Sequence, residues 1–224
     1  MERTRVKRRV GSLVTVLVVG WIGAVASASP IGVPLTPKKF SELFVGAENA
    51  IGDALVTDMS SGPLKSKVVS QAFEDGLGNY AYLYQITNTG AVGDHVIEVF
   101  TCNPFFGVSS SSTMGYLIDD DPPVEFTLGE QDLIGASVDA VAGPTVSFGF
   151  PGWMFPSWAI DPGESSVTLY VLSDAEPGMI TGNVIDGTIA SGNVVGPIPE
   201  PATLTMLALG GLAVLRRRRR AAIK

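Results

Sequence analysis

Three consecutive carboxylates, at Asp119, Asp120 and Asp121, form the densest group of oxygen ligands in the sequence. Calcium takes about six to eight oxygen ligands, so a loop that gathers three acids is a candidate cation site. The alternating acids and the later glutamate of a calcium-binding loop are missing, however. Pro122-Pro123 also favours an extended chain, in which adjacent side chains point apart. We therefore interpret these acids as a solvent-facing turn, and we assign no metal and no cofactor to the chain.

The single cysteine, Cys102, and the single histidine, His95, are the natural candidates for a nucleophile and its base. Both fall in one apolar segment that is predicted to be a strand. They are separated by an odd number of positions, so their side chains would project to opposite faces of that strand. We therefore predict that Cys102 is a buried structural thiol, with an intermolecular disulfide as the alternative.

Other catalytic patterns are missing from the sequence. It contains no Gly-x-Ser-x-Gly motif, no phosphate-binding glycine loop and no Cys/His zinc pattern. We assign no catalytic residues and expect a protein that is not an enzyme. A glycoside hydrolase stays open as a minor alternative, because any two acids could meet in the fold.

Aromatic residues are concentrated between prolines and glycines in the segment 148–158. Aromatic rings can stack on sugars, so one interpretation is a carbohydrate-binding platform. The interpretation that we favour is that Phe148, Trp153 and Phe155 fill the core or an edge of the fold. A carbohydrate-binding module that acts through calcium or aromatic contacts is therefore the alternative function.

The elements that must position these residues are mostly strands. Alternation in the segment 80–87 places four side chains on one face, namely Tyr80, Tyr82, Tyr84 and Ile86. The segment 95–102 is predicted to be its antiparallel partner. Residues 166–172 alternate in the same way, with Val167, Leu169 and Val171 on one side. Weaker strand patterns occur at 54–57, 67–73, 114–118, 124–128, 145–150 and 184–185.

Turn residues, chiefly Gly, Pro and Asp, separate all of these segments. Many short strands with Gly and Pro between them are typical of an all-β fold. We predict an antiparallel β-sandwich, Ig-like or jelly-roll-like, flanked by an N-terminal signal helix and a C-terminal transmembrane helix. One further helix is predicted over 38–50, because Phe40, Leu43, Phe44 and Ala47 recur at helical spacing.

The N-terminal segment has the features of a signal peptide. Five basic residues lie within 3–9, and an apolar run follows from Val10 to Val25. Ala26-Ser27-Ala28 then gives the small-x-small pattern that signal peptidase requires, which predicts a mature chain that starts near Ser29. We therefore assign residues 1–28 to a signal peptide that the general secretion machinery reads.

The C-terminal segment has an apolar stretch over 202–215 that is followed by a block of arginines. As a helix, its 14 residues would span about 21 Å, which is short of the ~30 Å hydrocarbon core. The basic block cannot cross the bilayer easily and is expected to stay cytoplasmic. It consists of Arg216, Arg217, Arg218, Arg219 and Arg220.

Pro199-Glu200-Pro201, the apolar segment and the arginine block together resemble the PEP-CTERM sorting signal of bacteria with two membranes. The resemblance covers about the last 25 residues, behind a β-rich central domain. It implies that a membrane-embedded processing enzyme, exosortase, recognises and cleaves the chain near the tripeptide. Many proteins with this signal are associated with extracellular polysaccharide, biofilm or floc.

The charge distribution excludes nucleic acid as a partner. Outside the two terminal signals only four lysines and no arginine remain, against 20 acids, so the net charge of the mature domain is near −16. Such a surface repels polyanions.

We therefore predict three regions: a signal peptide (1–28), an exported β-sandwich (29–194) and a sorting signal (195–224). The expected protein is exported and transiently anchored in the inner membrane. It would then be released to the cell surface or matrix as a structural or adhesive element. Extracellular polysaccharide is a further expected partner.

Overall fold

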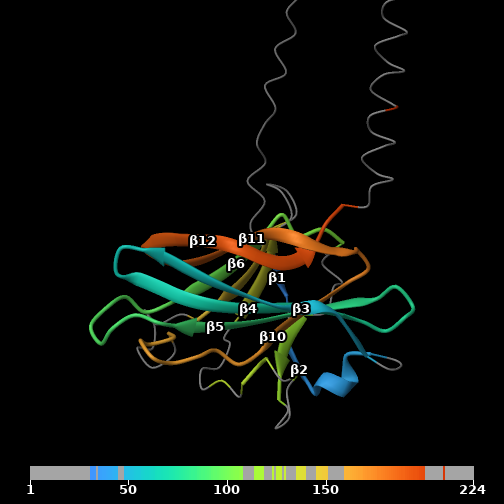
Figure 1. The fold of residues 1–224 in the computed structure, drawn as a ribbon, viewed down its shortest axis with the longest axis horizontal. Coiled ribbons are helices and arrows are strands. Elements are labelled where there is room, and N and C mark those ends of the chain that lie inside the picture. Colours follow the sequence, from blue (N-terminus) through green and yellow to red (C-terminus); the bar gives the residue numbers. More distant parts are fainter. Residues whose placement is uncertain are drawn as a thin grey trace, which may run out of the picture.

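Two six-stranded β-sheets make up the described part of the chain, which Figure 1 shows as a computed structural model. The described residues are 31–33, 35–44, 48–107, 114–118, 123, 125–127, 129, 135–139, 145–150, 159–199 and 209. The two sheets pack face to face over a shared apolar core. This architecture confirms the predicted all-β class and its two layers.

The first sheet is antiparallel throughout, in the order β1-β8-β9-β6-β11-β12. Its long hairpin joins β11 to β12 through Gly187, whose φ of 60° favours a residue without a side chain. In sheet order, the strands are Ile31–Val33 (β1), Gly135–Asp139 (β8), Thr145–Gly149 (β9), Val99–Asn103 (β6), Pro177–Asp186 (β11) and Thr188–Pro197 (β12).

The second sheet has the order β2-β7-β10-β5-β4-β3. Only the pairing of β2 with β7 is parallel, and the other neighbours are antiparallel. In sheet order, the strands are Leu35–Lys38 (β2), Met114–Leu117 (β7), Leu169–Ser173 (β10), Tyr80–Asn88 (β5), Leu64–Glu74 (β4) and Asn49–Ser61 (β3).

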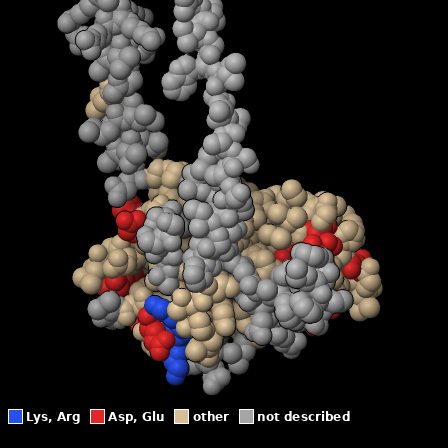
Figure 2. All heavy atoms as spheres, turned by 180° about the vertical axis from the view of Figure 1, so that it is seen from behind, with Lys and Arg blue, Asp and Glu red and all other residues tan. Residues whose placement is uncertain are grey.

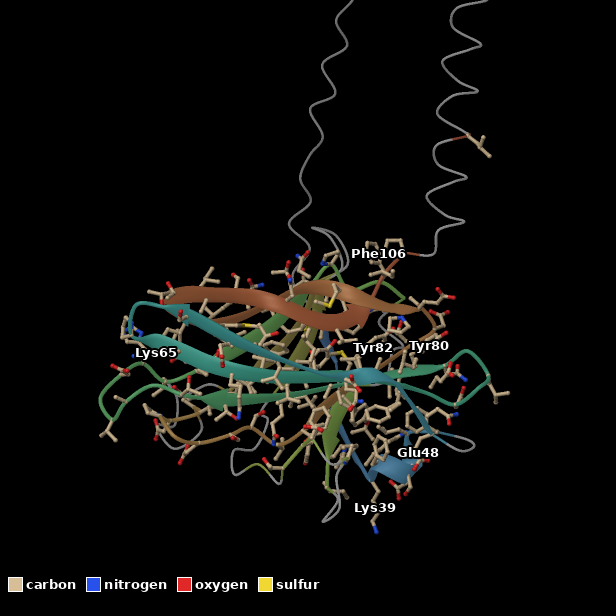
Figure 3. All side chains as sticks on the ribbon, viewed as in Figure 1. Lys39, Glu48, Lys65, Tyr80, Tyr82 and Phe106 are labelled. Carbon is tan, nitrogen blue, oxygen red and sulfur yellow. The ribbon has the colours of Figure 1, made fainter. Side chains whose placement is uncertain are left out.

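Strand β5 is buried on both of its faces. Tyr82, Tyr84 and Ile86 point between the sheets, which confirms that these alternating residues share one face. Ala81 and Leu83 point the other way, into a second apolar cluster on the outside of the sheet. Figure 3 shows Tyr82 in the space between the two sheets. The tyrosine-rich strand is therefore the centre of the fold rather than a binding face.

The helix predicted over 38–50 is wrong. Lys38 ends β2, Phe40–Glu42 forms a single 3-10 turn, and Asn49 begins β3. The side chain of Glu42 accepts a hydrogen bond from the backbone N–H of Lys39 at 3.1 Å. The apolar spacing has a different cause. The Phe40 ring packs edge-on against Phe73 of β4, with centroids 4.9 Å apart, and so covers the outside of the second sheet.

The predicted pairing between 80–87 and 95–102 is also wrong. β5 lies between β4 and β10, whereas β6 begins at Val99 and pairs with β9 and β11 in the other sheet. The chain crosses between sheets after Asn88. The side-chain amide of Asn88 donates to the backbone carbonyls of His95 (2.8 Å) and Ile160 (2.9 Å) and so fixes the crossing loop.

Several smaller predictions differ from the structure. Residues 125–127 of the strand predicted at 124–128 are not in a strand, although Phe126 is buried against the second sheet. Strands β1, β2, β8 and β12 were not predicted. The predicted signal helix lies outside the described residues. Within the described part of the chain, no helix is both long and apolar enough to span a membrane.

Candidate functional site

The most distinctive functional feature is the place where the chain leaves the sandwich, at the end of β12. Among the described strands, β12 lies at the edge of the first sheet, and β11 is its only neighbour there. An edge strand leaves every second pair of backbone groups without a partner in its own sheet. Here, side chains from the second sheet supply partners for three of those groups.

Three hydrogen bonds cross from the second sheet to the backbone of β12. The Tyr84 hydroxyl donates to the carbonyl of Val195 at 2.7 Å, and the Ser70 hydroxyl accepts from the N–H of Val195 at 3.0 Å. The Thr57 hydroxyl donates to the carbonyl of Asn193 at 2.6 Å. These bonds hold the last strand against β3, β4 and β5. β12 is therefore fixed to both sheets of the sandwich.

The fixed backbone continues past the end of the strand. Pro197 pairs with Pro177 as the last residue of β12, and the N–H of Ile198 donates to the carbonyl of Glu176 at 2.9 Å. The Ile198 side chain packs against the core between the sheets. It does so beside Gly178, where a Cβ would lie only 2.7 Å from Cγ2 of Ile198. Ile198 is therefore part of the folded domain.

Both ends of the sandwich domain lie at one end of the first sheet. Five antiparallel pairings separate β1 from β12, so these two edge strands run in opposite directions. β1 therefore begins at the end of the sheet where β12 finishes. Figure 3 shows Tyr80, the first residue of β5, and Lys65, near the start of β4, at opposite ends of the sandwich. By the strand directions, the chain leaves at the Tyr80 end.

Of the residues predicted to carry sorting or processing, only Pro199 lies in the described part of the chain, and it is half-buried. The remaining sorting residues and the signal-cleavage residues stay predictions, because they lie outside the described residues. They are Glu200, Pro201, Arg216, Arg217, Arg218, Arg219, Arg220, Ala26, Ala28 and Ser29.

Cys102 lies in the core between the sheets and is fully buried, which confirms the structural thiol. Burial raises the pKa of its thiol well above the ordinary value. The thiolate is the nucleophilic form of cysteine, so such a group is inert at neutral pH. His95 is not in β6 with Cys102. It lies before that strand, with Nδ1 3.0 Å from Oδ2 of Asp186, and both side chains are part-exposed.

The other residues that sequence analysis singled out divide into two groups. Phe148 is fully buried in the core, as the packing interpretation predicts, and so is Phe150. The remaining aromatic residues of that stretch and the acids 119–121 lie outside the described residues. Within the described ranges, no group of three or more His, Cys, Asp or Glu residues is arranged to hold a metal ion.

The roles of the residues that fasten β12 were not predicted from the sequence. The Asp186-Gly187 turn is a hairpin signal, and with it the run after Gly187 could have been read as a strand. The small and polar residues of β12 concealed this pattern. Ser70, Thr57 and Gly178 give no local signal at all, because their roles depend on contacts between segments far apart in the chain.

Comparison with known proteins identifies one region of the chain. Residues 197–220 match the family model for the PEP-CTERM protein-sorting motif. No curated protein and no solved structure matches the chain. The match begins at Pro197, the last residue of β12, so its first residues belong to the sandwich. The chain therefore carries a PEP-CTERM protein-sorting motif, which implies export to the cell envelope or surface and processing by an exosortase-type enzyme.

Proposed function

We propose that this chain is a non-catalytic surface or matrix protein whose β-sandwich is a structural or adhesive element in an extracellular polysaccharide or biofilm setting. The observation that carries this proposal is the direct fusion of a sorting motif to a rigid sandwich. The motif begins at Pro197, and Ile198 is still packed against the core. What is sorted is thus one well-packed β-domain.

The anchoring step follows from the composition of the C-terminal segment. The apolar stretch 202–215 and the arginines after it would hold the exported chain in the inner membrane until the enzyme removes them. Only Pro199, Glu200 and Pro201 lie between Ile198 and that stretch. The sandwich would therefore be held close to the membrane before release, with no long linker in between.

The proposed lack of catalysis is supported by where the reactive side chains lie. The thiol of Cys102 and the hydroxyls of Tyr82 and Tyr84 are buried in the core. The two tyrosine hydroxyls donate to the backbone carbonyls of Ala175 (2.5 Å) and Val195 (2.7 Å). These groups stabilise the sandwich and are inaccessible to a substrate. A screen of the purified full chain against glycans and peptides tests this part, and turnover of any substrate contradicts it.

The sorting part is tested in the native bacterium, with and without its exosortase gene. We expect the shortened protein at the surface or in the medium of the complete strain, and the full-length protein in the inner membrane of the deletion strain. Glu200→Ala should reproduce the deletion phenotype. Glu125→Ala, at an exposed acid far from the motif, is the matched control and should be processed normally. Identical location and size in both strains would refute the proposal.

A further inference from the structure

The outer face of the first sheet carries an array of eight small polar side chains. They form two rows across β9, β6, β11 and β12. The strand register places neighbours in each row side by side, and a hydrogen bond joins Asn103 to Thr145. The first row is Ser147, Thr101, Asn183 and Ser191, and the second is Thr145, Asn103, Thr181 and Asn193. We call these eight residues the polar array.

The alternation of each strand shows that the polar array faces outward. Phe100 and Cys102 flank Thr101 in β6, and both are buried in the core between the sheets. Val146, Val184 and Val194 are likewise buried next to array members in the other three strands. Because successive side chains of a strand project to opposite faces, the array lies on the side away from the core. Four of its members are exposed, namely Asn103, Thr181, Ser191 and Asn193.

Hydrogen bonds between strands fix several of the array side chains. In the first row, the Ser191 hydroxyl donates to Oδ1 of Asn183 at 2.7 Å, and the Asn183 amide donates to the Thr101 hydroxyl at 3.1 Å. In the second row, the Asn103 amide donates to the Thr145 hydroxyl at 2.8 Å. A ligand therefore meets side chains that are already oriented, which lowers the entropic cost of binding.

The polar array carries no charge, although the mature domain has a net charge near −16. Among the described residues, Figure 2 shows acidic side chains in several places on the rear of the molecule and basic side chains in one. The ends of the array are bordered by apolar side chains. Met179 is 56% exposed beyond the second row, and Ile189 is 59% exposed beyond the first. The array is thus an uncharged, hydrogen-bonding surface between two apolar borders.

We propose that the polar array binds a neutral polysaccharide, an inference that rests on the proposed surface function. Hydroxyl and amide groups both donate and accept hydrogen bonds, as the hydroxyls of a sugar do. Neighbouring strands lie about 4.8 Å apart and the two rows about 7 Å apart, so the array offers regularly repeated partners to a polymer. The apolar borders suit the C–H faces of sugar rings. The acidity of the domain disfavours a polyanionic glycan, and the lack of any charged side chain in the array favours a neutral glycan over a cationic one.

The test measures retention of the purified full chain on two neutral glucans, insoluble cellulose and cross-linked dextran, with the anionic alginate as comparison. The chain is kept in a detergent without a sugar headgroup, because a maltoside would compete. We expect retention on at least one neutral glucan and none on alginate. Thr181→Val removes one exposed hydroxyl and should weaken binding about 2- to 10-fold, the range for one hydrogen bond. Thr181→Glu adds a charge and a larger side chain, and it should weaken glucan binding by more than Thr181→Val does.

Ser60→Glu is the matched control, since Ser60 is exposed on β3 of the other sheet, and it should bind like the parent chain. Near-UV circular dichroism and Tm establish that each variant is folded. Lack of retention on both neutral glucans, retention on alginate alone, or equal loss in Thr181→Glu and Ser60→Glu would overturn the proposal. So would a self-associated parent chain that Thr181→Glu makes monomeric, because the face would then bind a second copy. A failure of sorting appears instead as full-length protein in the membrane of the host, a readout that glucan retention does not share.

Discussion

The side chain of Ile198 fills the space that a Cβ on Gly178 would need, because such a Cβ would lie 2.7 Å from Cγ2 of Ile198. Gly178 is the second residue of β11, and Ile198 is the second residue of the sorting motif. β11 therefore leaves an opening in the core for a residue of the motif. The sandwich and the sorting motif therefore share this contact.

Ile198→Ala should lower the free energy of unfolding. Burial of a whole isoleucine is worth about 2–5 kcal/mol against alanine, and Ile198 is only partly buried, so we expect about 1–2 kcal/mol. Ile189→Ala is the matched control, because Ile189 lies in β12 and is 59% exposed; it should change stability by less than about 0.5 kcal/mol. Denaturant titration of both variants measures the difference. Equal losses of unfolding free energy in the two variants would mean that Ile198 is not part of the core.

Tyr84→Phe should loosen β12 specifically. It removes the hydroxyl that donates to the carbonyl of Val195 at 2.7 Å, at an expected cost of about 1–2 kcal/mol. Tyr80→Phe, at the partly exposed start of the same strand, serves as control and should cost less than about 0.5 kcal/mol. Hydrogen exchange should show faster exchange of β12 amides in Tyr84→Phe only. Unchanged exchange in β12 would contradict a role for this bond in fastening the strand.

Alkaline pH should unfold the sandwich through its buried tyrosines. Burial raises the pKa of Tyr170 to about 12, and it raises the pKa values of Tyr82 and Tyr84 well above their ordinary value of 10.0. A tyrosine whose pKa is higher in the native state than in the unfolded state stabilises the fold. This contribution is complete at pH values below the unfolded-state pKa, and it is lost as the pH rises through the native-state pKa. Stability should therefore decline above about pH 10.

The tyrosinate absorbance tests this alkaline prediction. As the pH is raised, most of the tyrosinate absorbance of the chain's five tyrosines should appear over the same pH range in which circular dichroism shows unfolding. Ordinary titration of all five near pH 10, with the sandwich still folded, would show that these hydroxyls are accessible.

Cys102 should not react with a thiol reagent while the protein is folded. Its thiol is fully buried and its pKa is raised by that burial, so the reactive thiolate is scarce and shielded. Labelling with iodoacetamide should be slow in buffer and complete in guanidinium chloride. Labelling in buffer at the rate of a free thiol would reopen the intermolecular disulfide and the catalytic thiol as alternatives.

The sequence was most informative where a pattern is local. Alternation in 80–87 and around Val167, Leu169 and Val171 correctly groups the residues that share one face, and the structure shows that this face is turned to the core. Gly and Pro between short strands correctly indicate an all-β fold of two layers. These features follow from the two-residue period of a strand, which one segment displays by itself.

What the sequence could not show depends on pairing between distant segments. The apolar spacing around Phe40 is compatible with a helix and equally with the observed packing of Phe40 against Phe73. Only the position of β4 in the fold distinguishes these two structures. The same holds for β6, which joins the sheet opposite β5. The polar array was invisible for this reason, because its rows exist only once β9, β6, β11 and β12 lie in register.

The most direct test of the account is the intact mass of the protein recovered from the surface of its native host. Ile198 is held by the carbonyl of Glu176 and by the core, so we expect no cleavage before it. We expect a mature C-terminus at or beyond Ile198 and a mass that lacks the arginine block. A mature protein that keeps Arg216 to Arg220, or one that ends before Ile198, would contradict it.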